Sequence, residues 1–194
     1  MNAIVPVYIT AGGASSRFGR DKARAVLPDG RTLIEHVATR LQPVASTITV
    51  VADRPAKFAD LGFRTIADLR PGLGPLSGLH AALEDVADDS WLFYVSCDFL
   101  GFDHHWVEQL VANIEPGAGA VAFRSERWEP VFALYNASIL KAVAEAFAQS
   151  EHALWRLLDQ VSARALPLPA DWHRAKSINT KEDLDIYWKA ARAD

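Results

Sequence analysis

The sequence has little of several features that would define a protein class at once. Among its 194 residues there is a single cysteine, Cys97, so no disulfide can form within the chain, and a cytoplasmic location is expected. The formal net charge is −4, whereas nucleic-acid-binding domains usually carry a basic surface. No hydrophobic run is long enough to span a bilayer, and residues 1–10 lack the pattern of a signal peptide. These absences argue against a disulfide scaffold and against nucleic-acid or membrane partners.

The composition is that of an ordinary globular domain. Half of the residues are hydrophobic and 23% are charged. A chain of this length can bury a substantial core without disulfides. No repeat, low-complexity tract or linker interrupts it, so we predict one domain over residues 1–194.

Short apolar runs alternate with helical patterns in the first half of the chain. Four apolar runs predict strands at Ile4–Ile9, Thr47–Val51, Arg64–Ile66 and Trp91–Val95. The segments between them predict helices at Thr32–Leu41, Pro55–Asp60 and Pro75–Val86. Because apolar strands that alternate with helices form parallel sheets covered on both faces, we predict an α/β fold with three layers, similar to a Rossmann fold.

The second half predicts a departure from that regular alternation. Two strand-like runs, Gly119–Arg124 and Trp128–Tyr135, flank the polar tripeptide Ser125-Glu126-Arg127, which indicates a hairpin. The sheet is therefore expected to be mostly parallel, with an antiparallel excursion in this half. The other predicted elements are helices at Asp103–Ile114, Ser138–Gln149 and His152–Val161, and a strand at Ala163–Leu168. A closing helix follows, with Thr180 as its N-cap and Asp183 in its first turn.

The segment after the first predicted strand is rich in glycine and positive charge. Residues 10–22 include Gly12 and Gly13, followed by the cations Arg17 and Lys22. In open α/β sheets, ligands bind at the carboxyl ends of the strands. Glycine lets the backbone approach a ligand closely, and exposed amides with nearby cations suit phosphate. The loop therefore predicts a nucleotide site; the alternative is an ordinary strand-to-helix turn with solvated charges.

Two well-known phosphate loops do not fit this segment. A Walker A loop has the pattern Gly-x-x-x-x-Gly-Lys-Ser/Thr. The number of residues between Gly12 and Lys22 does not match this pattern. The dinucleotide fingerprint Gly-x-Gly-x-x-Gly is also absent. The pattern that remains is Gly-Gly-x-Ser-x-Arg-x-Gly-x-x-Lys.

Three aspartates follow the other predicted strands of the first half. Asp53, Asp68 and Asp98 come after the second, third and fourth strand, at the edge where the glycine-rich loop is expected. A carboxylate such as Asp98 suits Mg²⁺, which prefers carboxylate, water and phosphate oxygens. Each has an ordinary alternative: Asp98 as a loop or capping residue, Asp68 as a stabiliser of its own turn, and Asp53 as the cap of a helix after Pro55. Cys97 is interpreted as a small buried residue.

The remaining pattern resembles that of nucleotidyltransferases with a glycosyltransferase-A-like fold. Three later segments extend the likeness: Asp68-Leu-Arg-Pro-Gly-Leu-Gly-Pro-Leu-Ser-Gly-Leu79, Ser96-Cys-Asp98 and Ile178-Asn-Thr-Lys-Glu-Asp-Leu184. Together they are similar to the molybdenum cofactor guanylyltransferase family over about residues 4–188. Two positions depart from it: Leu100 stands where the family usually has proline, and Asp53 where it often has asparagine.

The resemblance implies transfer of GMP from GTP to the molybdenum–molybdopterin cofactor, with release of pyrophosphate. Arg17, Lys22 and Asp98 are the expected catalytic residues, with Asp98 as the ligand of Mg²⁺ and Mn²⁺ as the alternative ion. The expected nucleotide-binding residues are Thr10, Ala11, Gly12, Gly13, Lys22, Asp53, Asp68, Gly78 and Asp98. Residues 1–100 would bind the nucleotide and residues 101–194 the acceptor. The partners implied are these small molecules, with transient contacts to proteins that deliver or receive the cofactor.

The signals in the acceptor half are less specific. Arg124 and Arg127 are expected either to meet the acceptor phosphate or to be solvated hairpin charges, and Trp128 either to stack on a pterin or to belong to the core. Asn179 is expected near the active cleft or as a helix cap, and His104 shows no metal-ligand spacing. Three other functions stay open: a cytidylyltransferase on the same cofactor, another sugar- or alcohol-phosphate nucleotidylyltransferase, and a non-catalytic nucleotide-binding module.

Overall fold

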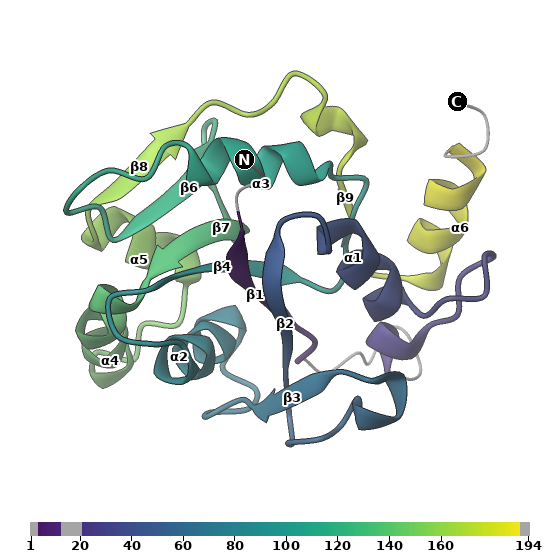
Figure 1. Cartoon of the computed structure of the whole chain (residues 1–194), viewed down its shortest axis with the longest axis horizontal. Helices are drawn as coiled ribbons and strands as arrows, with labels where there is room; N and C mark the ends of the chain where they lie inside the picture. Colours follow the sequence, from purple (N-terminus) through teal and green to yellow (C-terminus); the bar gives the residue numbers. More distant parts are fainter. Residues whose placement is uncertain (1–3, 13–20, 191–194) are drawn as a thin grey trace.

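A seven-stranded sheet forms the centre of the computed structural model, which describes residues 4–12 and 21–190 (Figure 1). Its strands are β1 (Val5–Thr10), β2 (Ala45–Ala52), β3 (Arg64–Ala67), β4 (Trp91–Ser96), β6 (Ala120–Arg124), β7 (Trp128–Asn136) and β8 (Ala163–Leu166). They are arranged in the order β3-β2-β1-β4-β7-β6-β8. Among these strands, β7 alone pairs antiparallel with both neighbours, and the other pairs are parallel. The predicted mostly parallel sheet with an antiparallel excursion is confirmed.

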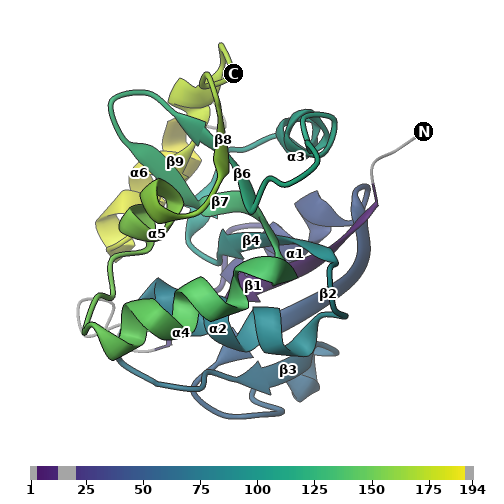
Figure 2. The same cartoon turned by 90° about the vertical axis from the view of Figure 1, so that its left-hand side faces the viewer.

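Helices cover both faces of this sheet and complete the three predicted layers (Figure 2). One face carries α1 (Leu33–Leu41), α3 (His104–Val111) and α6 (Lys181–Ala190), and the other carries α2 (Pro75–Asp85), α4 (Leu140–Ala148) and α5 (Leu154–Gln160). Each face buries its own apolar cluster against the sheet. In the described ranges, the helices are too short or too polar to cross a membrane.

Local capping contacts explain where several helices begin. The Thr32 side chain accepts a hydrogen bond from the Glu35 backbone amide, and the Glu35 carboxylate accepts one from the Thr32 amide, so α1 starts with a capping box. Thr180 and Asp183 exchange equivalent bonds before α6, as predicted. Asp103 accepts a bond from the His105 amide and caps α3.

The helix predicted at Pro55–Asp60 is wrong. The chain makes turns there and then only a short 3₁₀ helix, η2 (Ala59–Leu61). Ala56 has a φ of 56°, in the left-handed region that interrupts a right-handed helix. Asp53 therefore has no helix to cap.

A two-stranded ribbon, which the sequence pattern did not predict, ties the carboxyl end of the chain to the region after β4. Its strands are β5 (Phe99–Leu100) and β9 (Lys176–Ser177), and they pair antiparallel. Gly101 follows β5 with a φ of 80°, and a Cβ there would lie 2.1 Å from the carbonyl oxygen of Arg174. Only glycine fits this close approach. The ribbon holds the segment before α6 beside Asp98.

Candidate active site

The carboxyl ends of four parallel strands bring the predicted nucleotide-binding residues to one edge of the sheet. Thr10 at the end of β1 is level with Val51 on β2 and with Ser96 on β4, and Ala52 is level with Ala67 on β3. The residues that follow these strands are Ala11 and Gly12 after β1, and Asp53, Asp68 and Asp98 after β2, β3 and β4. Gly13 and Arg17 lie outside the described residues.

Lys22 and Asp98 form an ion pair at the centre of this edge. The Lys22 ammonium donates to Asp98 Oδ2 at 2.5 Å and to the carbonyl oxygen of Ile178 at 2.9 Å. The other carboxylate oxygen, Asp98 Oδ1, accepts from the Ser96 hydroxyl at 2.5 Å. Side-chain exposure is 16% for Lys22 and 17% for Asp98, so the pair is sheltered but reachable from solvent. Two of the three residues predicted to be catalytic therefore meet, although they are 76 positions apart.

The terminal motif takes part in this arrangement through its backbone. The Ile178 amide donates to the carbonyl oxygen of Asp98 at 2.9 Å, while the Ile178 carbonyl accepts from Lys22. Asn179 is exposed immediately beyond, and its amide donates to Asp183 at the start of α6. Asn179 thus follows the residue that contacts Lys22, and Thr180, not Asn179, supplies the side-chain cap of α6.

Asp68 stabilises its own loop and also faces Gly12. Its Oδ1 accepts hydrogen bonds from the Arg70 amide and from the buried hydroxyl of Ser77. Its Oδ2 points to the loop after β1, where a Cβ on Gly12 would lie 3.8 Å away. The turn-stabilising role is therefore present, and a second oxygen remains at the ligand edge.

Gly78 lies in the first half of α2, buried against the ends of the strands. A Cβ at this position would lie 2.5 Å from the Tyr94 hydroxyl and 3.1 Å from Thr10 Oγ1. The Tyr94 hydroxyl donates to the carbonyl oxygen of Pro75 at 2.8 Å, and burial raises its pKa. Gly78 thus lets α2 pack directly on β1 and β4. Its predicted contact with the nucleotide stays a prediction.

A lysine that the sequence reasoning missed connects Asp53 to the glycine-rich segment. Lys57 Nζ lies 2.7 Å from Asp53 Oδ1 and 2.9 Å from Asp21 Oδ2. The hydrogen bond from Lys57 lowers the pKa of Asp53. The signal in the sequence is the four-residue spacing between the opposite charges of Asp53 and Lys57.

The thiol of Cys97 cannot serve as a nucleophile. Cys97 is buried, and its burial raises the pKa of the thiol to about 12. The thiol is therefore protonated at neutral pH, as expected for a small core residue.

One group of potential metal ligands appears away from this edge. The ligand atoms of Asp103, His104 and His105 lie within 4.8 Å of one another, although the sequence spacing did not indicate a site. Ordinary contacts account for the group, because Asp103 caps α3 and His105 Nδ1 lies 2.6 Å from Glu108.

Comparison with known proteins identifies the family. The sequence matches the MobA-like NTP transferase domain over residues 7–165. The molybdenum cofactor guanylyltransferase of Serratia proteamaculans is 31% identical over 191 residues, which cover 97% of this chain and 96% of that protein. A Deinococcus radiodurans protein named "Probable molybdenum cofactor guanylyltransferase" is 36% identical over 178 residues, covering 91% and 90% of the two chains. This chain belongs to the MobA-like NTP transferase family.

A solved structure shares the same fold. Molybdopterin-guanine dinucleotide biosynthesis protein A from Archaeoglobus fulgidus superimposes with a TM-score of 0.82 at 22% identity, covering 97% of this chain and all of the other. The sequence resemblance to this nucleotidyltransferase family is therefore confirmed, together with the fold.

At the β6–β7 hairpin, the structure decides between the two roles expected for Trp128, stacking on a pterin or belonging to the core. Trp128 is only 8% exposed, the Arg124 guanidinium lies 4.6 Å from the centre of its ring, and its indole N–H donates to Asp159. Trp128 therefore belongs to the core and offers no open face. The exposed tryptophan is Trp155, which the sequence reasoning missed. The available signal was its position beside the apolar stripe of α5.

Proposed function

We propose that this chain transfers GMP from GTP to the molybdenum–molybdopterin cofactor and releases pyrophosphate. The observation that carries the proposal is the Lys22–Asp98 pair at the end of β4, beside the loop that follows β1. Membership of the MobA-like family and the names of its relatives support this nucleotide and this acceptor. The division into a nucleotide half at residues 1–100 and an acceptor half at residues 101–194 is part of this proposal.

The chemistry requires no nucleophile from the protein. An oxygen of the acceptor phosphate forms a bond to the α-phosphorus of GTP, and the bond from that phosphorus to the bridging oxygen breaks. Pyrophosphate leaves with the electron pair. Because the attacking phosphate is already anionic at neutral pH, the chain has to position two anions and neutralise their charge. Lys22 is placed for this task, and Arg17 is proposed to assist it.

The residues at the end of β4 fit a magnesium ion held jointly with the substrate. Mg²⁺ typically binds one or two carboxylates and completes its shell with water and phosphate oxygens. Asp98 supplies such a carboxylate, with 17% of its side chain exposed and Oδ1 oriented by Ser96. The ion, once bound, neutralises charge on the triphosphate. Lys22, at 2.5 Å from the same carboxylate, is close enough to contact phosphates gathered there.

Asp53 and Lys57 are the pair that we propose to recognise the base. A carboxylate can accept from both N1–H and the amino group of guanine, and an ammonium can donate to O6. Asp53 has 56% of its side chain exposed at the end of β2, and Lys57 lies 2.7 Å from it. An acceptor and a donor side by side match the edge of guanine. Cytosine offers only one amino donor to the carboxylate, so the pair favours GTP.

Pyrophosphate release separates this function from its rivals. The wild-type protein is incubated with Mg²⁺ and either GTP or CTP, with and without the molybdopterin acceptor. Release that requires both GTP and the acceptor is the expected result. Preference for CTP would overturn the assignment of the base. Nucleotide binding without release on this acceptor would overturn the catalytic assignment.

A further inference from the structure

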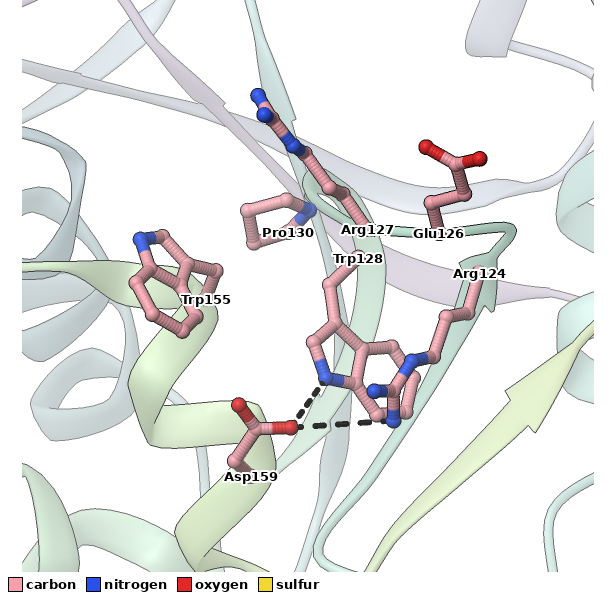
Figure 3. A pocket seen from close by; sticks show the side chains of 7 residues that line it. All are labelled: Arg124, Glu126, Arg127, Trp128, Pro130, Trp155 and Asp159. Atoms are coloured by element: carbon pink, nitrogen blue, oxygen red, sulfur yellow. Dashed lines mark hydrogen bonds and ion pairs between the residues drawn. The ribbon is translucent and has the colours of Figure 1, made fainter.

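A pocket of about 450 Å³ lies between the β6–β7 hairpin and α5 (Figure 3). It lies outside the nucleotide edge, by which we mean the carboxyl ends of β1 to β4 with Lys22, Asp53, Asp68 and Asp98. The hairpin lines the pocket with Arg124, Glu126, Arg127, Trp128 and Pro130, and α5 lines it with Trp155 and Asp159. It is the size of a site for a small organic molecule. Neither the nucleotide nor its metal accounts for these residues.

Trp155 presents an aromatic surface to this pocket. Its residue exposure is 48%, whereas Leu154, Leu157 and Leu158 of the same helix are at most 2% exposed. These leucines form the buried stripe of α5, and Trp155 lies beside it. Figure 3 shows Trp155 at the start of α5, on the other side of the pocket from Pro130 and Trp128. A large aromatic group held outside the core in this way provides a stacking surface.

Asp159 is held in a fixed orientation at the base of the pocket. Its Oδ1 accepts from the Trp128 indole N–H at 2.7 Å, and the Arg124 guanidinium lies 3.8 Å from the same oxygen. Within the part of the chain that the structure describes, Asp159 Oδ2 has no hydrogen-bond partner, and in Figure 3 the carboxylate faces the space beneath Trp155. Trp128 and Arg124 therefore position a carboxylate that keeps one acceptor available.

Strand register places the pocket beside the reacting centre. Phe132 on β7 pairs with Val95 on β4. Pro130, which lines the pocket, comes two residues before Phe132, and Asp98 comes three residues after Val95, so both lie beyond this pair toward the same edge of the sheet. Neighbouring strands are about 4.8 Å apart. A ligand in the pocket is thus one strand away from the carboxylate at which the phosphates are proposed to gather.

We propose that this pocket binds the fused heterocycle of the acceptor, with Trp155 stacking on the ring and Asp159 Oδ2 accepting its N–H groups. The inference rests on the proposed function, which makes the acceptor a pterin. A pterin carries a 2-amino group next to a ring N–H, and a carboxylate oxygen suits these donors. Arg127 forms no ion pair with the described residues and extends from the hairpin in Figure 3, where it can meet the acceptor phosphate.

Binding of 6-hydroxymethylpterin to the full chain tests the pocket without turnover. The fluorescence of the pterin is titrated with wild-type protein, Trp155→Ala and Trp155→Phe. Because stacking on an aromatic side chain is lost in the alanine variant, we expect its affinity to fall about tenfold, with most of it restored by phenylalanine. Ile186→Ala removes another exposed apolar side chain, 60% exposed on α6, and serves as the matched control that leaves binding unchanged.

Lumazine tests the carboxylate, because it has a carbonyl where pterin has the 2-amino group. Wild-type protein is expected to bind 6-hydroxymethylpterin more tightly than lumazine. Asp159→Asn keeps an oxygen for the Trp128 N–H and replaces the free oxygen with an amino group, so this preference should shrink. An unchanged preference would overturn the role of Asp159.

Turnover separates this inference from the proposed function. In Trp155→Ala the KM for the acceptor is expected to rise about tenfold, while the KM for GTP stays at the wild-type value. Wild-type turnover with an unchanged acceptor KM and unchanged pterin affinity in Trp155→Ala would overturn the pocket assignment alone. Absence of turnover in the wild type would overturn the proposed function, and the pterin titration would still decide whether the pocket binds the heterocycle.

Discussion

The nucleotide edge and the hairpin pocket differ in how far their polar groups are already paired. At the end of β4, both oxygens of Asp98 accept hydrogen bonds from protein side chains, Oδ2 from Lys22 and Oδ1 from Ser96. At the hairpin, Trp155 is exposed and one oxygen of Asp159 has no partner among the described residues. A ligand that binds Asp98 must replace existing contacts, whereas a ligand that binds Asp159 Oδ2 adds new ones.

This difference has energetic consequences for the two ligands. Replacing an ion pair such as Lys22–Asp98 costs free energy that a highly charged ligand and its metal must offset, so binding there should weaken as salt concentration rises. Stacking on Trp155 depends on the contact of apolar surface and is much less sensitive to salt. The nucleotide edge is therefore suited to a polyanion, and the pocket to a ring.

Asp98→Asn should separate the two regions most strongly. The amide removes the charge that would hold the metal, so kcat is expected to fall by about a hundredfold to a thousandfold. Binding of 6-hydroxymethylpterin at the hairpin should not change. Asp103→Asn, in the cap of α3, is the control for a lost aspartate charge. A kcat close to that of the wild type in a folded Asp98→Asn protein would contradict the proposed role of Asp98 as a metal ligand.

Gly78→Ala tests whether the nucleotide edge depends on the close packing of α2. The added methyl group would lie 2.5 Å from the Tyr94 hydroxyl, so we expect a loss of about 1–3 kcal/mol in the free energy of unfolding. Urea unfolding measures it. In a Tyr94→Phe background the nearest obstacle is removed, and the same glycine substitution should cost less. Equal costs in both backgrounds would contradict this packing explanation.

Lys57→Met tests the proposed recognition of the base. Methionine keeps most of the apolar stem but removes the donor beside Asp53, so the KM for GTP should rise about tenfold while the acceptor KM stays constant. Lys141→Met, on a lysine whose side chain is 89% exposed on α4, is the matched control. A GTP KM equal to that of the wild type would place base recognition elsewhere.

Two carboxyl groups, Asp53 at the end of β2 and Glu129 on β7, have pKa values shifted in opposite directions. Lys57 lowers the pKa of Asp53, whereas burial raises the pKa of Glu129 on β7. A lowered folded-state pKa stabilises the protein above the ordinary aspartate value of about 3.9, and this contribution is lost as the pH falls through the folded value. A raised pKa has the opposite sign, because ionised Glu129 costs stability above the ordinary glutamate value of about 4.3.

We therefore expect Asp53→Asn to lower the free energy of unfolding at neutral pH and Glu129→Gln to raise it. The Asp53 effect should be small because its side chain is 56% exposed. Urea unfolding at about pH 7 and about pH 3 should show both differences shrinking in acid. Changes of the same sign in the two variants would contradict the assigned shifts.

The parts of the site that follow from strand order were predictable from the sequence. Asp68 and Asp98 were placed at one edge because parallel strands end there, and the register confirms that placement. The contact between Lys22 and Ile178 was not predictable, because the two residues are 156 positions apart. The acceptor is a backbone carbonyl, which every residue has, so the identity of residue 178 does not indicate the contact. The role of Asp68 in its own loop likewise depends on Ser77, whose hydroxyl donates to the Asp68 carboxylate. The sequence spacing of the two residues does not show in which direction that hydroxyl points.

The tryptophans show the same limit at the hairpin. Two neighbouring arginines suggested that Trp128 stacks on a ligand. In the structure the Arg124 guanidinium lies over its ring, and its indole N–H donates to Asp159. Trp155 is exposed because it falls outside the stripe of Leu154, Leu157 and Leu158, which helical periodicity does predict. Its approach to the hairpin depends on the tertiary packing of α5, and local sequence carries no signal for that.

The reversed direction of β7 has a consequence for how such a protein can diversify. Because β7 runs opposite to β4 and β6, residues 125–127 form a short tip at the functional edge of the sheet, while the turns on the far side are untouched. Insertions or exchanges at this tip would reshape the surface offered to the second substrate and leave the register of β1 to β4 intact. Grafting hairpins from related domains is thus a practical route to new acceptors on an unchanged nucleotide platform.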